Sequence, residues 1–176
     1  MKKVLALALV AAAAGTASAN TVDVNLAGWN TFGGFLAPGN TNTSISLPIG
    51  TQITQIEWID LTFTSINGSW RSELTLSVND SLTGPFWDSK VSTDDTPGVY
   101  GPGSGLFANP GLFGSGPFTM TTGTLYIEAY ESFNDGGNAV QDAAIASGTL
   151  RITYIPTPGA AALLGMGGLL AARRRR

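Results

Sequence analysis

Apolar residues in the middle of this chain recur at every second position, and no stretch repeats them with the 3.6-residue period of a helix. Leu74, Leu76 and Val78 fall on one side of an extended chain. Thr75 and Ser77 fall on the other side. Because a strand buries a face of period two and a helix does not, the body of the chain, residues 20–154, is predicted to be all-β.

Short alternating segments separated by turn residues predict about seven or eight strands. We expect strands within residues 22–26, 45–47, 53–63, 70–78, 125–130 and 150–155. The longest of these segments changes its apolar parity at Trp58 and Ile59, and a β-bulge there would keep both halves in the core. The predicted architecture is an antiparallel β-sandwich with jelly-roll connectivity.

Two segments, residues 53–78 and 123–155, resemble bacterial P-domain and galactose-binding-like sandwiches. The resemblance lies in a long strand, the approach Trp-Arg-Ser-Glu-Leu into the next strand, and a final strand Gly-Thr-Leu-Arg-Ile-Thr-Tyr. It implies the same kind of two-sheet fold.

Residues 97–117 are rich in Gly and Pro and are predicted to form a long loop. Within it, Gly105-Leu106-Phe107 recurs as Gly111-Leu112-Phe113. Phe107 and Phe113 either form a platform that faces a ligand or plug one end of the sandwich. The second alternative is favoured, because exposed Leu-Phe pairs promote aggregation.

The chain contains neither His nor Cys. This composition excludes a Ser-His-Asp triad, a Cys nucleophile, zinc or iron–sulfur ligation through these residues, and disulfide bonds. The fold must therefore be stabilised by its core, with a bound metal ion as the remaining aid.

Charge is sorted by position along the chain. All 12 acidic residues lie in the body, whereas six of the nine basic residues lie at the two ends. Only Arg71, Lys90 and Arg151 remain in the body. Because nucleic-acid affinity depends on Lys and Arg at phosphates, nucleic-acid binding is not expected, and cations are the better electrostatic partners.

The N-terminus has the pattern of a secretory signal peptide. A basic start precedes an apolar run over residues 4–14, and Ala17 and Ala19 supply the small residues that signal peptidase requires. Residues 1–19 are predicted to be removed, which leaves Asn20 as the first residue. The alternatives are a short membrane anchor and a buried helix, but the run is too short to span about 30 Å of hydrocarbon.

The C-terminus, residues 155–176, combines a proline motif, an uncharged apolar run over residues 160–172, and a final Arg cluster. The proline motif is Pro156, Thr157, Pro158 and Gly159, and the cluster is Arg173, Arg174, Arg175 and Arg176. The arginines are expected to hold the end of a short transmembrane helix on the cytoplasmic side. Snorkelling of their side chains would compensate for the shortness of the helix.

This ordered arrangement resembles the PEP-CTERM sorting signal, with Thr157 where the family usually has Glu. The resemblance implies recognition by an exosortase, a membrane-embedded sorting enzyme, with cleavage near the proline motif. It further implies a bacterial protein, anchored transiently by its C-terminus and then delivered to the cell surface or the extracellular matrix. A plain membrane tail without processing is the alternative.

Two acidic segments have the ligands that a calcium ion takes from proteins. Asp135, Asn138 and Asp142 alternate with flexible glycines and form the predicted calcium site. Asp94 and Asp95, with Asp88 nearby in sequence, are a weaker candidate. The alternative for both segments is ordinary turn and surface chemistry.

Carboxylates and aromatic side chains also admit carbohydrate chemistry. Glycoside hydrolysis needs only two carboxylates, which Glu57, Glu73, Glu128 and Glu131 could supply. The strand parity places Glu57 and Glu73 opposite the core face, however, where an ordinary solvated strand also has such residues. Four aromatic residues could stack on sugar rings or else cap the core: Trp29, Trp70, Trp87 and Tyr100.

We therefore expect an exported, non-enzymatic protein with a structural or adhesive role beside exopolysaccharide. The alternatives are a carbohydrate- or calcium-dependent binding module and, third, a carboxylate-dependent glycan hydrolase. No catalytic residue and no cofactor other than calcium is predicted.

Overall fold

The computed structural model describes residues 18–82, 86–107 and 118–157. Ten strands and no helix are found in these ranges. The strands are β1 (Asn20–Asn25), β2 (Asn30–Thr31), β3 (Asn42–Ser46), β4 (Gln52–Ser65), β5 (Leu74–Asp80), β6 (Phe86–Lys90), β7 (Gly98–Leu106), β8 (Phe118–Thr119), β9 (Thr124–Glu131) and β10 (Ala143–Ile155).

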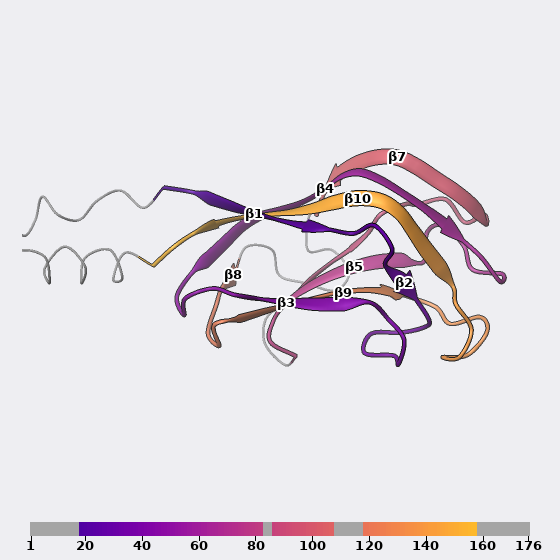
Figure 1. The fold of residues 1–176 in the computed structure, drawn as a ribbon, viewed down its shortest axis with the longest axis horizontal. Helices are drawn as coiled ribbons and strands as arrows, with labels where there is room; N and C mark the ends of the chain where they lie inside the picture. The colour runs from indigo at the N-terminus through magenta and orange to yellow at the C-terminus, as the bar shows by residue number, and fades with distance from the viewer. Residues whose placement is uncertain (1–17, 83–85, 108–117, 158–176) are drawn as a thin grey trace, which may run out of the picture.

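The strands form two antiparallel sheets that face one another (Figure 1). One sheet has the order β1-β10-β4-β7, with the short strands β2 and β8 paired to β10 and β4. The other sheet has the order β3-β9-β5-β6. The predictions of an all-β chain and of two antiparallel sheets are therefore confirmed.

The core lies between the two sheets and is built from the alternating apolar residues of both. Ile56, Leu61 and Phe63 of β4 are fully buried, as are Leu76 of β5 and Ile127 of β9. Strand β4 changes its inward parity between Trp58 and Leu61, where the pairing with β7 also shifts register. The predicted bulge is therefore present, but it centres on Ile59 and Asp60, and Ile59 itself is only half-buried.

The prediction of a continuous loop over residues 97–117 is wrong, because residues 98–106 form β7 along the edge of β4. Glycine allows this pairing: a Cβ on Gly105 would come within 2.3 Å of the Trp58 ring. Phe107 is buried and packs edge-on against Trp58 and Trp87, with ring centroids 5.8 and 6.2 Å apart. Phe107 therefore plugs the core, whereas Phe113 lies outside the described residues.

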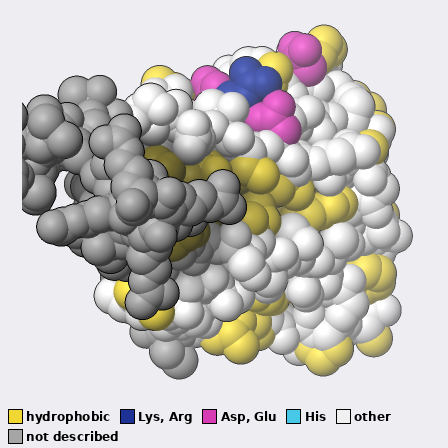
Figure 2. Space-filling view, turned by 60° about the vertical axis from the view of Figure 1, so that its left-hand side comes forward, with side chains coloured by type: hydrophobic (Ala, Val, Ile, Leu, Met, Phe, Trp, Pro, Cys, Tyr) yellow, Lys and Arg dark blue, Asp and Glu magenta, His cyan; other side chains and the backbone are white. Residues whose placement is uncertain are grey.

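The two ends of the sandwich differ in what they carry. Asn20 of β1 pairs with Tyr154 of β10, so the chain enters and leaves the sandwich at one end, which we call the terminal pole (Figure 1). Strands β4 and β9 end, and β5 begins, at the opposite end, which we call the distal pole. The face seen in Figure 2 has few charged side chains and a band of apolar ones.

Within the described ranges, no helix is long and apolar enough to cross a bilayer. The predicted signal peptide up to Ala17 and the predicted apolar helix at residues 160–172 lie outside those ranges.

Candidate functional site

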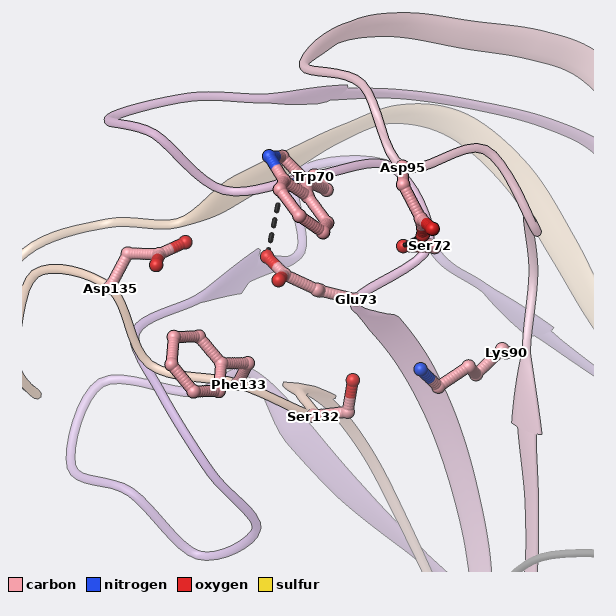
Figure 3. Close-up of a pocket in the computed structure, with 8 residues that line it drawn as sticks. All are labelled: Trp70, Ser72, Glu73, Lys90, Asp95, Ser132, Phe133 and Asp135. Carbon is pink, nitrogen blue, oxygen red and sulfur yellow. Dashed lines mark hydrogen bonds between the residues drawn. The ribbon is translucent and has the colours of Figure 1, made fainter.

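A pocket of about 530 Å³ opens at the distal pole, where the turn before β5 meets the chain that follows β9 (Figure 3). Its volume lies within the roughly 300–1,000 Å³ typical of small-molecule sites. The lining residues come from three segments that are distant in sequence: Trp70, Ser72, Glu73, Lys90, Asp95, Ser132, Phe133 and Asp135.

Two aromatic side chains of the pocket are exposed to solvent. Trp70 is 45% exposed and Phe133 is 63% exposed. The three other tryptophans, Trp29, Trp58 and Trp87, are buried in the core. Of the tryptophans, Trp70 is therefore the one whose ring is available to a ligand.

The carboxylate of Glu73 points into the space between these two rings (Figure 3). One of its oxygens, Oε2, accepts hydrogen bonds from the Trp70 amide at 2.8 Å and the Ser69 hydroxyl at 3.0 Å. The side chain thus closes the turn that carries Trp70. Its other oxygen, Oε1, has no hydrogen-bond partner within the described part of the chain. Glu73 is only 7% exposed, so the prediction that it lies on a solvated strand face is wrong.

Further charged groups stand at the rim of the pocket. Asp95 accepts a hydrogen bond of 2.5 Å from the Ser72 hydroxyl, and the neighbouring Arg71 forms an ion pair of 2.5 Å with Asp94. These contacts hold the segment after β6 against the turn before β5. Asp135 and Lys90 are exposed at the rim, and neither forms an ion pair within the described ranges. The lining therefore carries three carboxylates and one ammonium group.

A second layer of polar groups lies behind Glu73. The Ser69 hydroxyl is 3.0 Å from Glu131 Oε2, and Thr31 donates a hydrogen bond of 2.8 Å to Glu131 Oε1. Burial raises the pKa of Glu131 to about 8; the two hydroxyls lower it in part, and the negative charges of Asp142 and Glu73 add to the rise. Glu131 is therefore largely protonated at neutral pH, and it does not line the pocket.

The residues of the predicted calcium site have different surroundings. Asp135 lines the pocket, whereas Asn138 is exposed and its Oδ1 accepts a hydrogen bond of 2.5 Å from Asn134. Asp142 is fully buried, and neither of its carboxylate oxygens has a hydrogen-bond partner among the described residues. Burial raises the pKa of Asp142, and the charge of Asp135 raises it further. No group of three or more acidic side chains in the described ranges is arranged to hold a metal ion.

The weaker acidic candidate is not assembled as a site. Asp94 pairs with Arg71 and Asp95 with Ser72, as described above. Asp88 instead accepts hydrogen bonds from Ser77 and Tyr130 on the outer face of β5 and β9. Asp88, Asp94 and Asp95 therefore each bind different side chains and do not converge on one cation site.

Of the four glutamates considered for glycoside hydrolysis, Glu73 alone lines the pocket. Glu128 is fully buried beneath residues 32–40, where it accepts hydrogen bonds from the Leu36 amide, Asn40 and Tyr126. Glu57 lies on the other sheet, 4.0 Å from Arg151. Glu128 therefore holds residues 32–40 against the sheet, and Glu57 forms a surface ion pair with Arg151.

The remaining aromatic candidates are parts of the core. Trp29 and Trp87 are 7% and 6% exposed. Tyr100 is half-buried and packs on Phe63 with a centroid distance of 5.2 Å. The sequence indicated Trp70 as a candidate for stacking on sugars, but Phe133 was missed. The one sequence feature that could have indicated Phe133 is its position directly before the turn residues Asn134-Asp135-Gly136.

The sorting residues fall at the terminal pole or outside the described ranges. Asn20 begins β1, and Ala19 precedes it. Pro156 and Thr157 follow β10, and the Thr157 hydroxyl donates a hydrogen bond of 2.9 Å to the Ile49 carbonyl. The residues outside the described ranges are Ala17, Pro158, Gly159, Arg173, Arg174, Arg175 and Arg176.

Comparison with known proteins gives distant structural similarity only. No protein-family profile matches the chain. No curated protein matches it either. The subviral-particle structure of VP2 from infectious bursal disease virus is 15% identical over 77% of this chain and 32% of that chain, with a TM-score of 0.32. The VP1 pentamer of human polyomavirus 6 is 9% identical over 80% of this chain and 94% of that chain, with a TM-score of 0.28. The chain thus spans about a third of the VP2 chain.

Proposed function

We propose that this chain is an exported, non-enzymatic protein of the cell surface or extracellular matrix, and that its sandwich binds a carbohydrate in the pocket between Trp70 and Phe133. The observation that carries the proposal is the pair of exposed rings on either side of the buried Glu73 carboxylate. Flat aromatic rings fit the apolar C–H faces of sugars, and a fixed carboxylate accepts hydrogen bonds from their hydroxyl groups.

Export and sorting rest on the two ends of the sequence. The signal-peptide pattern of residues 1–19 favours secretion, and the PEP-CTERM-like residues 155–176 favour sorting by an exosortase-type enzyme. A tail that leaves from the terminal pole would direct the pocket at the distal pole away from the membrane. This orientation suits an adhesive protein that binds matrix polysaccharide.

We further propose jelly-roll connectivity for the sandwich. Apart from the two-residue strands β2 and β8, each sheet has four strands. Their orders, β1-β10-β4-β7 and β3-β9-β5-β6, make the chain cross between the sheets repeatedly, as in two interlocked Greek keys.

A hydrolase would need a second carboxylate poised across a sugar ring from Glu73. The other two carboxylates of the lining, Asp95 and Asp135, are exposed, and Asp95 accepts a hydrogen bond from Ser72, which favours a non-enzymatic role. The neighbouring Glu131 is 1% exposed and is held by Thr31 and Ser69. It therefore does not reach a ligand in the pocket.

The test is a titration of the exported protein, produced from the full chain, with an array of oligosaccharides. Because Trp70 is the exposed tryptophan, a bound sugar should change its fluorescence and protect it from a soluble quencher. We expect Trp70→Ala to abolish binding. The matched control is Phe86→Ala, which removes an exposed aromatic ring outside the pocket and should leave binding unchanged.

Two results would contradict the proposal. One is the absence of binding to every oligosaccharide on the array. The other is the release of reducing sugar that Glu73→Gln abolishes, which would make the chain a glycan hydrolase.

A further inference from the structure

We propose that the carbohydrate bound in this pocket carries a protonated amine, so that the ligand is an amino sugar with a free ammonium group. The inference rests on the proposed function and names the class of its ligand. It follows from the chemistry of the pocket lining, which joins aromatic rings to carboxylates.

The first step is the balance of charge in the lining. Glu73, Asp95 and Asp135 contribute carboxylates, and Lys90 contributes the one ammonium group. None of these four residues forms an ion pair within the described ranges. A neutral sugar would leave the surplus of negative charge uncompensated, whereas a ligand cation would offset it.

The second step is the state of Glu73. Glu73 is only 7% exposed and lines the pocket, and its Oε1 atom has no hydrogen-bond partner among the described residues. This oxygen remains accessible at the pocket, and a ligand N–H⁺ would supply it with a strong, charge-assisted hydrogen bond.

The third step is the placement of the rings. Trp70 lies on one side of the Glu73 carboxylate and Phe133 on the other (Figure 3). A cation held by Glu73 would therefore lie beside aromatic faces, which attract it through their quadrupoles. The same faces stack on the sugar ring that carries the amine, so one small site can hold both parts of the ligand.

The test compares three oligosaccharides of equal length with the exported protein: glucosamine oligomers, their N-acetylated counterparts and glucose oligomers. These differ at one ring position, which carries an ammonium, an amide or a hydroxyl group. We expect the glucosamine oligomer to bind at least tenfold more tightly than either of the others. Rising salt should reduce the preference only in part, because salt screens the exposed carboxylates Asp95 and Asp135 but screens the largely buried Glu73 much less.

Two variants link the preference to the pocket. Glu73→Gln should remove most of the preference for the amine. Because Glu73 also closes the turn that carries Trp70, Asp135→Asn at the exposed rim provides a second, structurally neutral change, for which a smaller loss of preference is expected. Asp60→Asn is the matched control, because it removes an exposed carboxylate that is not part of the pocket lining.

Four outcomes separate the inference from the proposed function. A tenfold preference that falls in Glu73→Gln supports the inference. Equal binding of the three oligomers overturns it and leaves carbohydrate binding intact. A peptide that carries trimethyl-lysine is titrated in parallel. If this peptide binds and no oligomer does, the inference and the proposed function are both overturned, and the pocket binds a cationic side chain of another protein. The absence of all binding overturns both as well.

Discussion

Glu73 and Glu131 each bring a carboxylate oxygen to 3.0 Å from the same hydroxyl group, that of Ser69. One hydroxyl hydrogen can serve only one of the two acceptors. A proton on Glu131 resolves the conflict, because the acid can then donate to Ser69 while Ser69 donates to Glu73. The two carboxyl groups are thus coupled through one serine, directly behind the pocket.

This coupling predicts that stability falls as pH rises from mildly acidic to mildly alkaline. The pKa of Glu131 is raised from 4.5 to about 8 in the folded protein, so the folded state binds the proton more tightly than the unfolded state does. The free energy of unfolding should therefore decrease across the interval from about pH 4.5 to pH 8. Burial also raises the pKa of Asp88 and Asp142, which acts in the same direction.

Thermal unfolding between pH 5 and pH 8.5 measures the effect. We expect the melting temperature to be lower at pH 8.5 by several degrees, since each pKa unit corresponds to about 1.4 kcal/mol. Glu131→Gln mimics the neutral acid and should flatten the profile. A wild-type profile as flat as that of the variant would show that Glu131 titrates normally.

Close packing of β7 on β4 predicts contrasting effects for two glycines of β7. Both Gly98 and Gly101 have positive φ, at 115° and 96°. A Cβ on Gly101 would come within 2.1 Å of the Leu61 carbonyl oxygen, whereas a Cβ on Gly98 would have no atom within 4 Å. Gly98→Ala should cost about 1 kcal/mol of backbone strain, and Gly101→Ala roughly 3 kcal/mol or more, because the backbone must shift as well. Urea unfolding of both variants tests this, and equal losses would argue against strand β7.

Processing of the chain predicts the mass of the exported protein. We expect it to begin at Asn20 and to end close to Pro156, Thr157, Pro158 and Gly159, as determined by intact-mass measurement of material released from cells. Replacement of Arg173, Arg174, Arg175 and Arg176 by Ser should weaken membrane retention before processing, because four positive charges resist translocation. Released protein that still ends in Arg176 would refute sorting by cleavage.

The contact of Thr157 with the sandwich predicts an effect on that cleavage. Thr157→Val keeps the shape of the side chain but removes the hydrogen bond to the Ile49 carbonyl. We expect faster removal of the tail, because the proline motif would then be held less firmly against residues 49–50. Pulse-chase analysis of the exported chain measures the rate, and an unchanged rate would show that the contact does not limit access.

The buried carboxylate of Asp142 predicts that calcium stabilises the fold. Asp142 is buried with both carboxylate oxygens unpaired among the described residues, and a cation shared with Asp135 and Asn138 would relieve this. We expect calcium to raise the melting temperature, since a ligand at a hundredfold excess over its Kd stabilises the folded state by about 2.7 kcal/mol. Magnesium at equal ionic strength should act less, because it requires octahedral geometry. A response that persists in Asp135→Ala would move the ion away from this loop.

Sequence periodicity was sufficient for the two-sheet architecture, because Leu76 and Ile127 are buried on the side that the alternation of apolar residues assigns to the core. It failed at β7, since the glycines and proline of residues 98–106 are typical of loops. The glycines are required because β7 packs closely on β4: a Cβ at Gly105 would collide with the Trp58 ring, and one at Gly101 with the Leu61 carbonyl oxygen. That information lies about 40 residues away in the sequence.

The pocket could be predicted only in part. Alternation shows which residues face the core, but it does not show that other segments cover the outer face. Residues 32–40 cover Glu128, and Phe35 packs on Tyr126 and Tyr130 with centroids 6.1 and 5.7 Å apart. Glu73 and Phe133 likewise meet only because β5 and β9 are antiparallel neighbours.

The position of β10 has a mechanical consequence. This strand of 13 residues extends about 40 Å from the distal pole to the terminal pole, between β1 and β4. If the tail anchors the protein while the pocket binds a polymer, tension acts along β10 and pulls it parallel to its neighbours β1 and β4. Its backbone hydrogen bonds then share the load in shear and do not open one after another, so the fold is suited to hold against a steady pull.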